Sequence, residues 1–140
     1  MRRIAEACYN DEASLSVTSG IPQSHRFRSC TVYDSRYFRT VHDSDNYEYL
    51  VANKSARYLI FVYASFEEGA DGGLGTGISD ANGNGTWDRN LFSLWYTNGY
   101  ATQMTTLFPY INADDIIKWT GFSNATRRVY NVIMEIFSIE

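Results

Sequence analysis

Short runs of strand-forming residues, separated by turn residues at close intervals, are the feature that most constrains the fold of this chain. The runs lie at 15–18, 26–33, 36–41, 47–52, 56–66, 90–96, 100–108 and 129–139. Segments such as SGIPQS (19–24) and HDSDN (42–46) break the pattern with Gly, Pro, Asn and Asp. Many short strands at this spacing are typical of an all-β sandwich or barrel. We therefore expect a β-sandwich with a jelly-roll or immunoglobulin-like topology.

Two of the runs are apolar on both faces. They are ARYLIFVYASF (56–66) and VYNVIMEIFSI (129–139). A strand with only one covered face alternates between apolar and polar residues, whereas a strand covered on both faces does not. These two strands are therefore predicted to lie in the middle of a sheet with cover on each side.

The remaining segments carry weaker patterns. The first twenty residues are mixed, and 15–18 is only a weak strand. The segment 112–119 (NADDIIKW) is the only candidate helix, because Asn112 is a good cap and Asp114 and Asp115 suit a helix N-terminus. Turns are expected at 97–99 (TNG) and 120–124 (TGFSN). The prediction is thus all-β, with one short helix at most.

The chain is expected to form one domain spanning 1–140, because 140 residues is an ordinary domain length. The stretch 69–88 (GADGGLGTGISDANGNGTWD) holds seven of the ten glycines. Since it lies between two core strands, it is predicted to be a long loop within the domain.

Charge and hydropathy exclude two classes of partner. The 12 basic and 16 acidic residues give a net charge of −4, and no basic patch is evident, so nucleic-acid binding is not expected. Neither a signal peptide nor a membrane-length apolar run is recognisable, since the N-terminus (MRRIAEACYNDE) is charged. No membrane association is expected.

The glycine-rich stretch does not fit a phosphate-binding loop. Such a loop needs a Lys and a Ser or Thr after its last glycine, followed by a helix. Here the next cation is Arg89, a strand follows, and the G-x-G-x-x-G spacing of dinucleotide sites is absent.

The second half of this stretch resembles the start of an EF-hand-type calcium loop. Oxygen-bearing side chains recur at Asp80, Asn82, Asn84 and Asp88, with Gly85 at the turn. The resemblance ends where the family has a bidentate Glu, because that position holds Leu91. An Asn-Gly turn explains the same residues. Calcium is therefore the one cofactor that stays open, and no other is expected.

No catalytic motif is present, so we expect a protein that is not an enzyme. His25 and His42 lie beside turns, and none of the H-E-x-x-H, G-x-S-x-G or C-x-x-C patterns occurs. Cys30 with a distant His is a conceivable nucleophile pair, but a small buried structural Cys is favoured. Whether Cys8 and Cys30 form a disulfide stays open.

Aromatic residues cluster beside the glycine-rich stretch, at Trp87, Trp95, Tyr96 and Tyr100. Exposed aromatic rings near Asn and Asp can stack on sugars, whereas buried rings would pack in the core or at an interface. This cluster is the predicted binding surface, with a glycan as one candidate ligand.

The segment 98–130 combines a G-Y-x-x-Q strand at Gly99–Gln103 with a W-T-G turn and an N-x-T turn. In this it resembles the small β domains of bacteriophage tail fibres and virion surfaces. The resemblance implies a virion structural protein, a capsid decoration or a tail or fibre component. Such a protein would be made in the host cytoplasm and would act through contacts with other virion proteins, as a homo-oligomer or in receptor binding. The alternatives are a carbohydrate-binding module with a calcium-stiffened loop and a small phage-encoded inhibitor.

Overall fold

The computed structural model describes the backbone of residues 1–10, 16–17, 23–42, 46–79, 89–123 and 127–140. Side chains are described for 1–10, 25–42, 46–65, 106–119 and 128–140. The described strands are β1 (Arg2–Tyr9), β2 (Ser16–Val17), β3 (Gln23–His25), β4 (Ser29–Val32), β5 (Phe38–His42), β6 (Glu48–Ala52), β7 (Ala56–Ser79), β8 (Arg89–Leu107), β9 (Tyr110–Ile111), β10 (Ile116–Ser123) and β11 (Arg127–Ser138).

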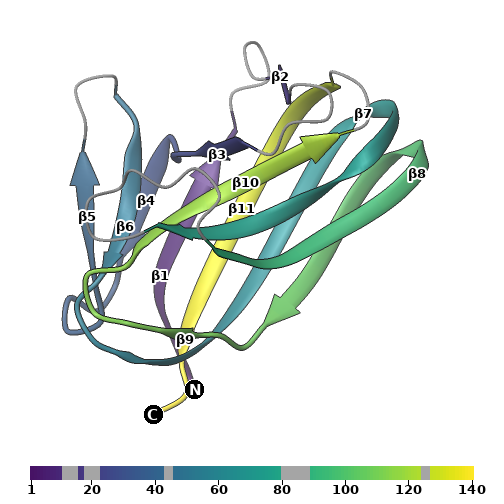
Figure 1. Cartoon of the computed structure of the whole chain (residues 1–140). Helices are drawn as coiled ribbons and strands as arrows, with labels where there is room; N and C mark the ends of the chain where they lie inside the picture. The colour runs from purple at the N-terminus through teal and green to yellow at the C-terminus, as the bar shows by residue number, and fades with distance from the viewer. Residues whose placement is uncertain (11–15, 18–22, 43–45, 80–88, 124–126) are drawn as a thin grey trace.

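The strands form two antiparallel sheets that face each other. The first sheet has the order β4-β1-β11-β7-β8, using 56–66 of β7 and 101–107 of β8. The second has the order β5-β6-β10-β7-β8, using 72–79 of β7 and 89–96 of β8. The long strands β7 and β8 pass from one sheet into the other, and β10 crosses in front of β1 and β11 (Figure 1). The predicted β-sandwich is confirmed, with jelly-roll topology.

Part of the glycine-rich stretch belongs to a strand and not to a loop. β7 continues to Ser79, so residues 72–79 pair with β10, residues between 70 and 78 pair with β8, and only 80–88 lie outside the described residues. The register with β8 shifts between Phe66 and Ala70, between Ala70 and Gly72, and between Gly75 and Gly77. Glycine is suited to such bulges because it tolerates unusual backbone angles. Turn-like composition here marks the bend by which β7 changes sheets.

The predicted helix at 112–119 is wrong. Asp114 has a φ of 73°, which no α-helix contains. Asn112 donates its backbone N–H to Asp115 Oδ2 at 3.0 Å, and Asp115 donates its own to the Asn112 carbonyl at 3.1 Å. The side chains that suit a helix cap suit this turn equally well. The chain then enters β10 at Ile116.

Two predicted turns and one undetected strand also differ from expectation. Residues 97–99 lie within β8 and 120–123 lie within β10, so these turn signals do not end a strand. β1 was not predicted, although it lies between β4 and β11. Its buried side chains are Ile4, Ala5, Ala7 and Tyr9, of which two are small, and a register shift between Arg3 and Ala5 interrupts its alternation.

The core lies between the two sheets. Its largest fully buried side chains include Trp119, Tyr9, Tyr58, Phe27 and Phe38. From the two central strands of the first sheet, the inward residues Ile60, Val62, Val132, Met134 and Ile136 are all fully buried. Burying apolar area of this kind is the main term that stabilises the sandwich.

The expectation for the two runs that are apolar on both faces is half right. β7 and β11 do lie in the middle of the first sheet. The second sheet covers their inner face, but no described element packs on their outer face. One apolar face of the pair is therefore left to solvent by the part of the chain that is described.

Candidate functional site

The predicted calcium ligands Asp80, Asn82, Asn84 and Asp88 lie outside the described residues. The calcium loop therefore stays a prediction. Among the side chains that are described, no group of three or more His, Cys, Asp or Glu is placed to hold a metal ion.

The predicted aromatic surface is also largely outside what the structure describes. Trp87 falls in 80–88, and the side chains of Trp95, Tyr96 and Tyr100 are not described. Their backbone lies in β8, where Trp95 is opposite Gly73 and Tyr96 is opposite Gly72. The structure thus places three of the four on one strand, and their role in binding stays a prediction.

The outer face of the first sheet is the most distinctive surface of the described residues. Side chains alternate along a strand, so the residues between the buried ones point outward. On β7 and β11 the apolar ones are Leu59, Phe61, Tyr63, Ile133 and Phe137, which we call the outer apolar face; the polar Ser65, Asn131 and Glu135 point the same way. They sit in adjacent register, with Tyr63 opposite Ile133 and Phe137 opposite Leu59.

The rings of the outer apolar face pack on one another but remain accessible. Phe61 and Phe137 meet edge to face, with ring centroids 5.4 Å apart and an interplanar angle of 89°. Tyr63 keeps 37% of its surface exposed. Large exposed apolar surface of this kind marks interaction sites on folded proteins.

A depression of about 310 Å³ lies beside this face, between β1, β7 and β11. Tyr63 and Ile133 form its apolar wall, and Glu6, Ser65, Asn131 and Glu135 supply polar atoms. Asn131 Oδ1 is buried and accepts no hydrogen bond. An unsatisfied buried acceptor is costly, and this one lies beneath the surface of the depression.

The β1 side of the depression carries a small charged cluster. Arg3 Nη1 lies 3.7 Å from Glu6 Oε2 and 3.9 Å from Glu135 Oε2, and its guanidinium stacks 4.6 Å from the Tyr33 ring centroid. The Tyr33 hydroxyl donates to Glu6 Oε2 at 2.9 Å. This hydrogen bond raises the pKa of Tyr33. The single Arg3 guanidinium thus lies within ion-pair distance of two carboxylates.

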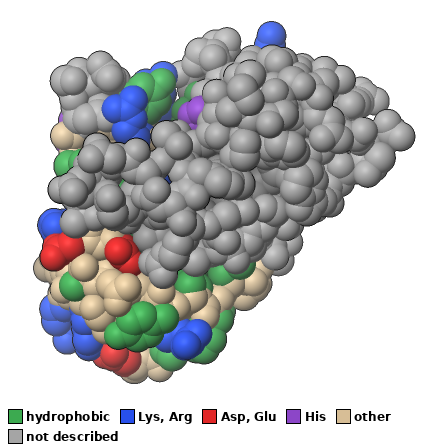
Figure 2. All heavy atoms as spheres, viewed as in Figure 1, with side chains coloured by type: hydrophobic (Ala, Val, Ile, Leu, Met, Phe, Trp, Pro, Cys, Tyr) green, Lys and Arg blue, Asp and Glu red, His purple; other side chains and the backbone are tan. Residues whose placement is uncertain are grey.

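Arg57 stands on the same outer side of β7, toward the lower end of the sandwich. Its Nη1 donates to the carbonyl of Phe108 at 3.0 Å, and its guanidinium lies 5.3 Å from the Phe108 ring centroid. Phe108 and Tyr110 are each 49% exposed. In Figure 2, hydrophobic side chains at the lower end of the described surface are interspersed with basic and acidic ones.

The two cysteines are free and lie in adjacent strands. Cys30 is opposite Ala7, and Cys8 is opposite Ser29, so the two thiols point to opposite faces of the sheet. The open question of a disulfide is thereby settled against a bridge between them.

The residues considered for nucleophilic catalysis do not form a reactive pair. Glu48 accepts the backbone N–H of Cys30 at 2.6 Å and pairs with His42 Nδ1 at 3.1 Å. Burial raises the pKa of the Cys30 thiol, and Glu48 raises it further. A protonated thiol is a poor nucleophile. His25 instead stacks on Trp119, with ring centroids 4.5 Å apart.

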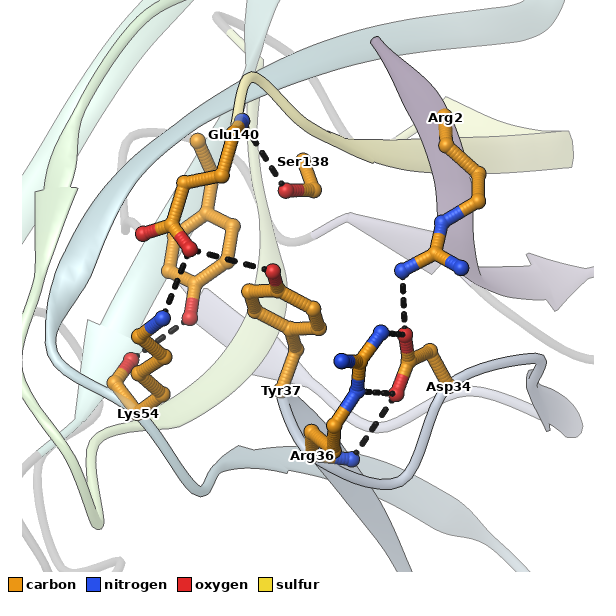
Figure 3. A network of polar contacts seen from close by, with 8 residues as sticks. Arg2, Asp34, Arg36, Tyr37, Lys54, Ser138 and Glu140 are labelled. Atoms are coloured by element: carbon orange, nitrogen blue, oxygen red, sulfur yellow. Dashed lines mark hydrogen bonds and ion pairs between the residues drawn. The ribbon is translucent and has the colours of Figure 1, made fainter.

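A polar network ties the chain ends to the same end of the sandwich (Figure 3). Glu140 Oε2 accepts from Lys54 Nζ at 2.6 Å and from the Tyr37 hydroxyl at 3.1 Å. Separately, Asp34 binds Arg2 and Arg36, and the Arg36 hydrogen bond holds the pKa of Asp34 well below its usual range. These exposed pairs link the two chain ends to neighbouring segments and have a structural role.

Sequence reasoning missed the outer apolar face as a site. The signal was present, since 56–66 and 129–139 were recognised as apolar on both faces, but it was interpreted as burial within the chain. The depression could not be foreseen, because Glu6 comes from β1, and the pairing of β1 with β11 was not predicted.

Comparisons with known proteins agree on the architecture. No protein-family profile matches the chain, and no curated protein sequence is similar to it. The described part of the chain contains no helix that could cross a bilayer. The globular domain of zebrafish complement 1qA is 14% identical and superposes with a TM-score of 0.64, covering 98% of each chain. The Eiger TNF structure from S. frugiperda is 11% identical, with a TM-score of 0.65, over 100% of this chain and 95% of that one. The chain therefore has the jelly-roll β-sandwich fold of C1q and TNF domains.

Proposed function

We propose that this chain is a non-catalytic assembly domain whose copies associate through the outer apolar face. The observation that carries the proposal is the pair of central strands, which carry apolar side chains on both sides and are covered by described elements on only one. An apolar surface at the centre of a sheet, rather than at its rim, is best explained by a partner that covers it.

The fold supports a second copy as that partner. Domains of the C1q and TNF type are typically homotrimers. A closed homo-oligomer needs only one kind of surface patch on each copy, or two complementary patches. The outer apolar face, with its rings and its mixed charged border, has the composition of such an interface.

We further propose that this assembly is a structural component of a bacteriophage virion. This setting rests on the resemblance of 98–130 to tail-fibre and virion-surface domains, while the two structural neighbours named above are not phage proteins. Mass spectrometry of purified particles from the phage that encodes the chain tests it. Finding the chain only in the lysate and never in particles would exclude the virion role.

Calcium binding and glycan binding stay separate predictions, because their residues lie outside the described side chains. Measuring the solution mass by light scattering, once with calcium and once with chelator, tests the calcium prediction. A glycan array with calcium present tests the second.

The assembly itself is tested by solution mass, measured by light scattering after size exclusion. We expect the wild-type chain to form a defined oligomer and Phe61→Glu to be a folded monomer, because a carboxylate cannot be buried unpaired at the interface. Thr40→Glu, at an exposed position on β5 of the second sheet, is the matched control and should remain oligomeric. A wild-type monomer at all concentrations would exclude the proposal.

A further inference from the structure

We infer that the depression on the outer face is a socket for an arginine side chain, and that Arg57 of a neighbouring copy occupies it. This inference rests on the proposed self-association and names the polar contact that would orient it. Three features of the depression point to a guanidinium, and one feature of Arg57 points to its identity.

The first feature is the supply of acceptors. Glu6 and Glu135 present carboxylates, and Ser65 and Asn131 add polar side chains to the lining. A guanidinium carries five N–H donors in a planar fork and no acceptor, so it complements such a set.

The second feature is the wall. Tyr63 offers a partly exposed ring and Ile133 an aliphatic surface. The stem of an arginine packs on apolar surface while its head group binds polar atoms, and its guanidinium also stacks on aromatic rings. A volume of about 310 Å³ is ample for one such side chain.

The third feature is the charge. Glu6 and Glu135 bring two negative charges, and Arg3 brings one positive charge at 3.7 and 3.9 Å. The described side chains around the depression therefore leave one negative charge uncompensated. Covering it with an apolar partner would be costly, whereas a single cation neutralises it.

Arg57 is the complementary charge on the same face. Its guanidinium contacts the carbonyl and the ring of Phe108, and it pairs with no carboxylate among the described residues. Six residues separate it from Tyr63 on β7, which at about 3.3 Å each is about 20 Å. Arg57 therefore cannot enter the depression of its own chain.

Each copy thus carries one depression with an excess negative charge and one arginine that pairs with no carboxylate among the described residues. In a closed assembly every socket can receive an arginine from a neighbour, so no charge remains uncompensated. Charge complementarity of this kind fixes the orientation of an interface more than it adds to affinity.

A double-mutant cycle on the full-length chain tests the inference, with the dissociation constant of the oligomer measured by sedimentation. The variants are Arg57→Gln, Glu135→Gln and the double variant. Asp114→Asn, which removes an exposed carboxylate remote from the face and keeps a residue that tolerates positive φ, is the control.

We expect each single variant to weaken association about tenfold and the double variant to be no weaker than either single one, because both remove the same contact. The control should be unchanged. An oligomeric wild type in which the singles have no effect, or in which their effects multiply to about a hundredfold, overturns the socket and leaves the proposed self-association intact. A wild type that is monomeric overturns both.

Discussion

The two faces of the central strand pair differ chiefly in cover, although the outward face also carries Asn131 and Glu135. Inward from β7 and β11 point Ile60, Val62 and Ile136, all fully buried, while outward point Phe61 and Ile133, which are partly exposed. These named residues are equally apolar, so their type alone does not say which of them will be covered by the chain itself. On the proposal that copies associate through the outer apolar face, a strand that is apolar on both faces predicts cover in the assembly and not within the single chain.

The largest test of this comparison removes the same side chain from each face. Ile136→Ala leaves a cavity in the closed core and should cost about 2–5 kcal/mol of unfolding free energy. Ile133→Ala, on the outer face, should cost less than about 1 kcal/mol in the dissociated chain, because solvent fills the space. Urea unfolding at a concentration that keeps the protein monomeric measures both. Equal losses would mean that the outer face is packed within the chain.

A titratable group on the inner side gives the next largest effect. Burial, and Arg26 to a smaller extent, lowers the pKa of His25 to about 4 from its ordinary value near 6.5. Between these pH values the unfolded chain binds a proton that the folded chain does not, so stability is complete above pH 6.5 and falls as the pH drops toward 4. The loss is at most about 3 kcal/mol, from 1.36 kcal/mol per unit.

The variant His25→Gln should lose this part of the pH dependence, as measured by urea unfolding at pH 4.5 and 7. His42, which is exposed and paired with Glu48, supplies the control variant His42→Gln. If both variants keep the wild-type slope, His25 is not shielded from water, and the contrast between a closed inner side and an open outer side weakens.

Much of the fold could be predicted because strand signals are local. The runs at 36–41, 47–52, 56–66 and 129–139 all overlap strands, and alternation or apolarity was enough to find them. What failed depended on context. Asn112 to Asp115 offer the same side-chain hydrogen bonds to a helix cap and to a turn, and only the pairing of β10 with β6 decides between them.

The site was less predictable for a physical reason. Glycines between 69 and 79 look like a loop because turns and bulges need the same backbone freedom, and the sheet-to-sheet bend of β7 is a long-range event. The depression joins Glu6, Tyr63 and Glu135 from three strands, and that meeting is set by register. No local pattern encodes it.

The smallest effect on stability is expected at the end of the sandwich, at contacts that belong to neither face of the central strands. Glu140 is paired with Lys54 and hydrogen-bonded by Tyr37, and these contacts lower the pKa of Glu140 and raise that of Lys54. Glu140→Gln should therefore shift the urea midpoint only slightly, because exposed pairs gain little and are screened by salt. The wild-type contribution is present above the ordinary pKa of a glutamate and is lost as the pH falls below it.

The shift should shrink further in 1 M NaCl (a Debye length of about 3 Å), whereas the effect of Ile136→Ala should persist. A loss for Glu140→Gln as large as that of the core variant, and insensitive to salt, would show that the chain end is part of the cooperative core. In that case the chain end would belong with the closed core, and the outer apolar face alone would differ from the rest of the molecule.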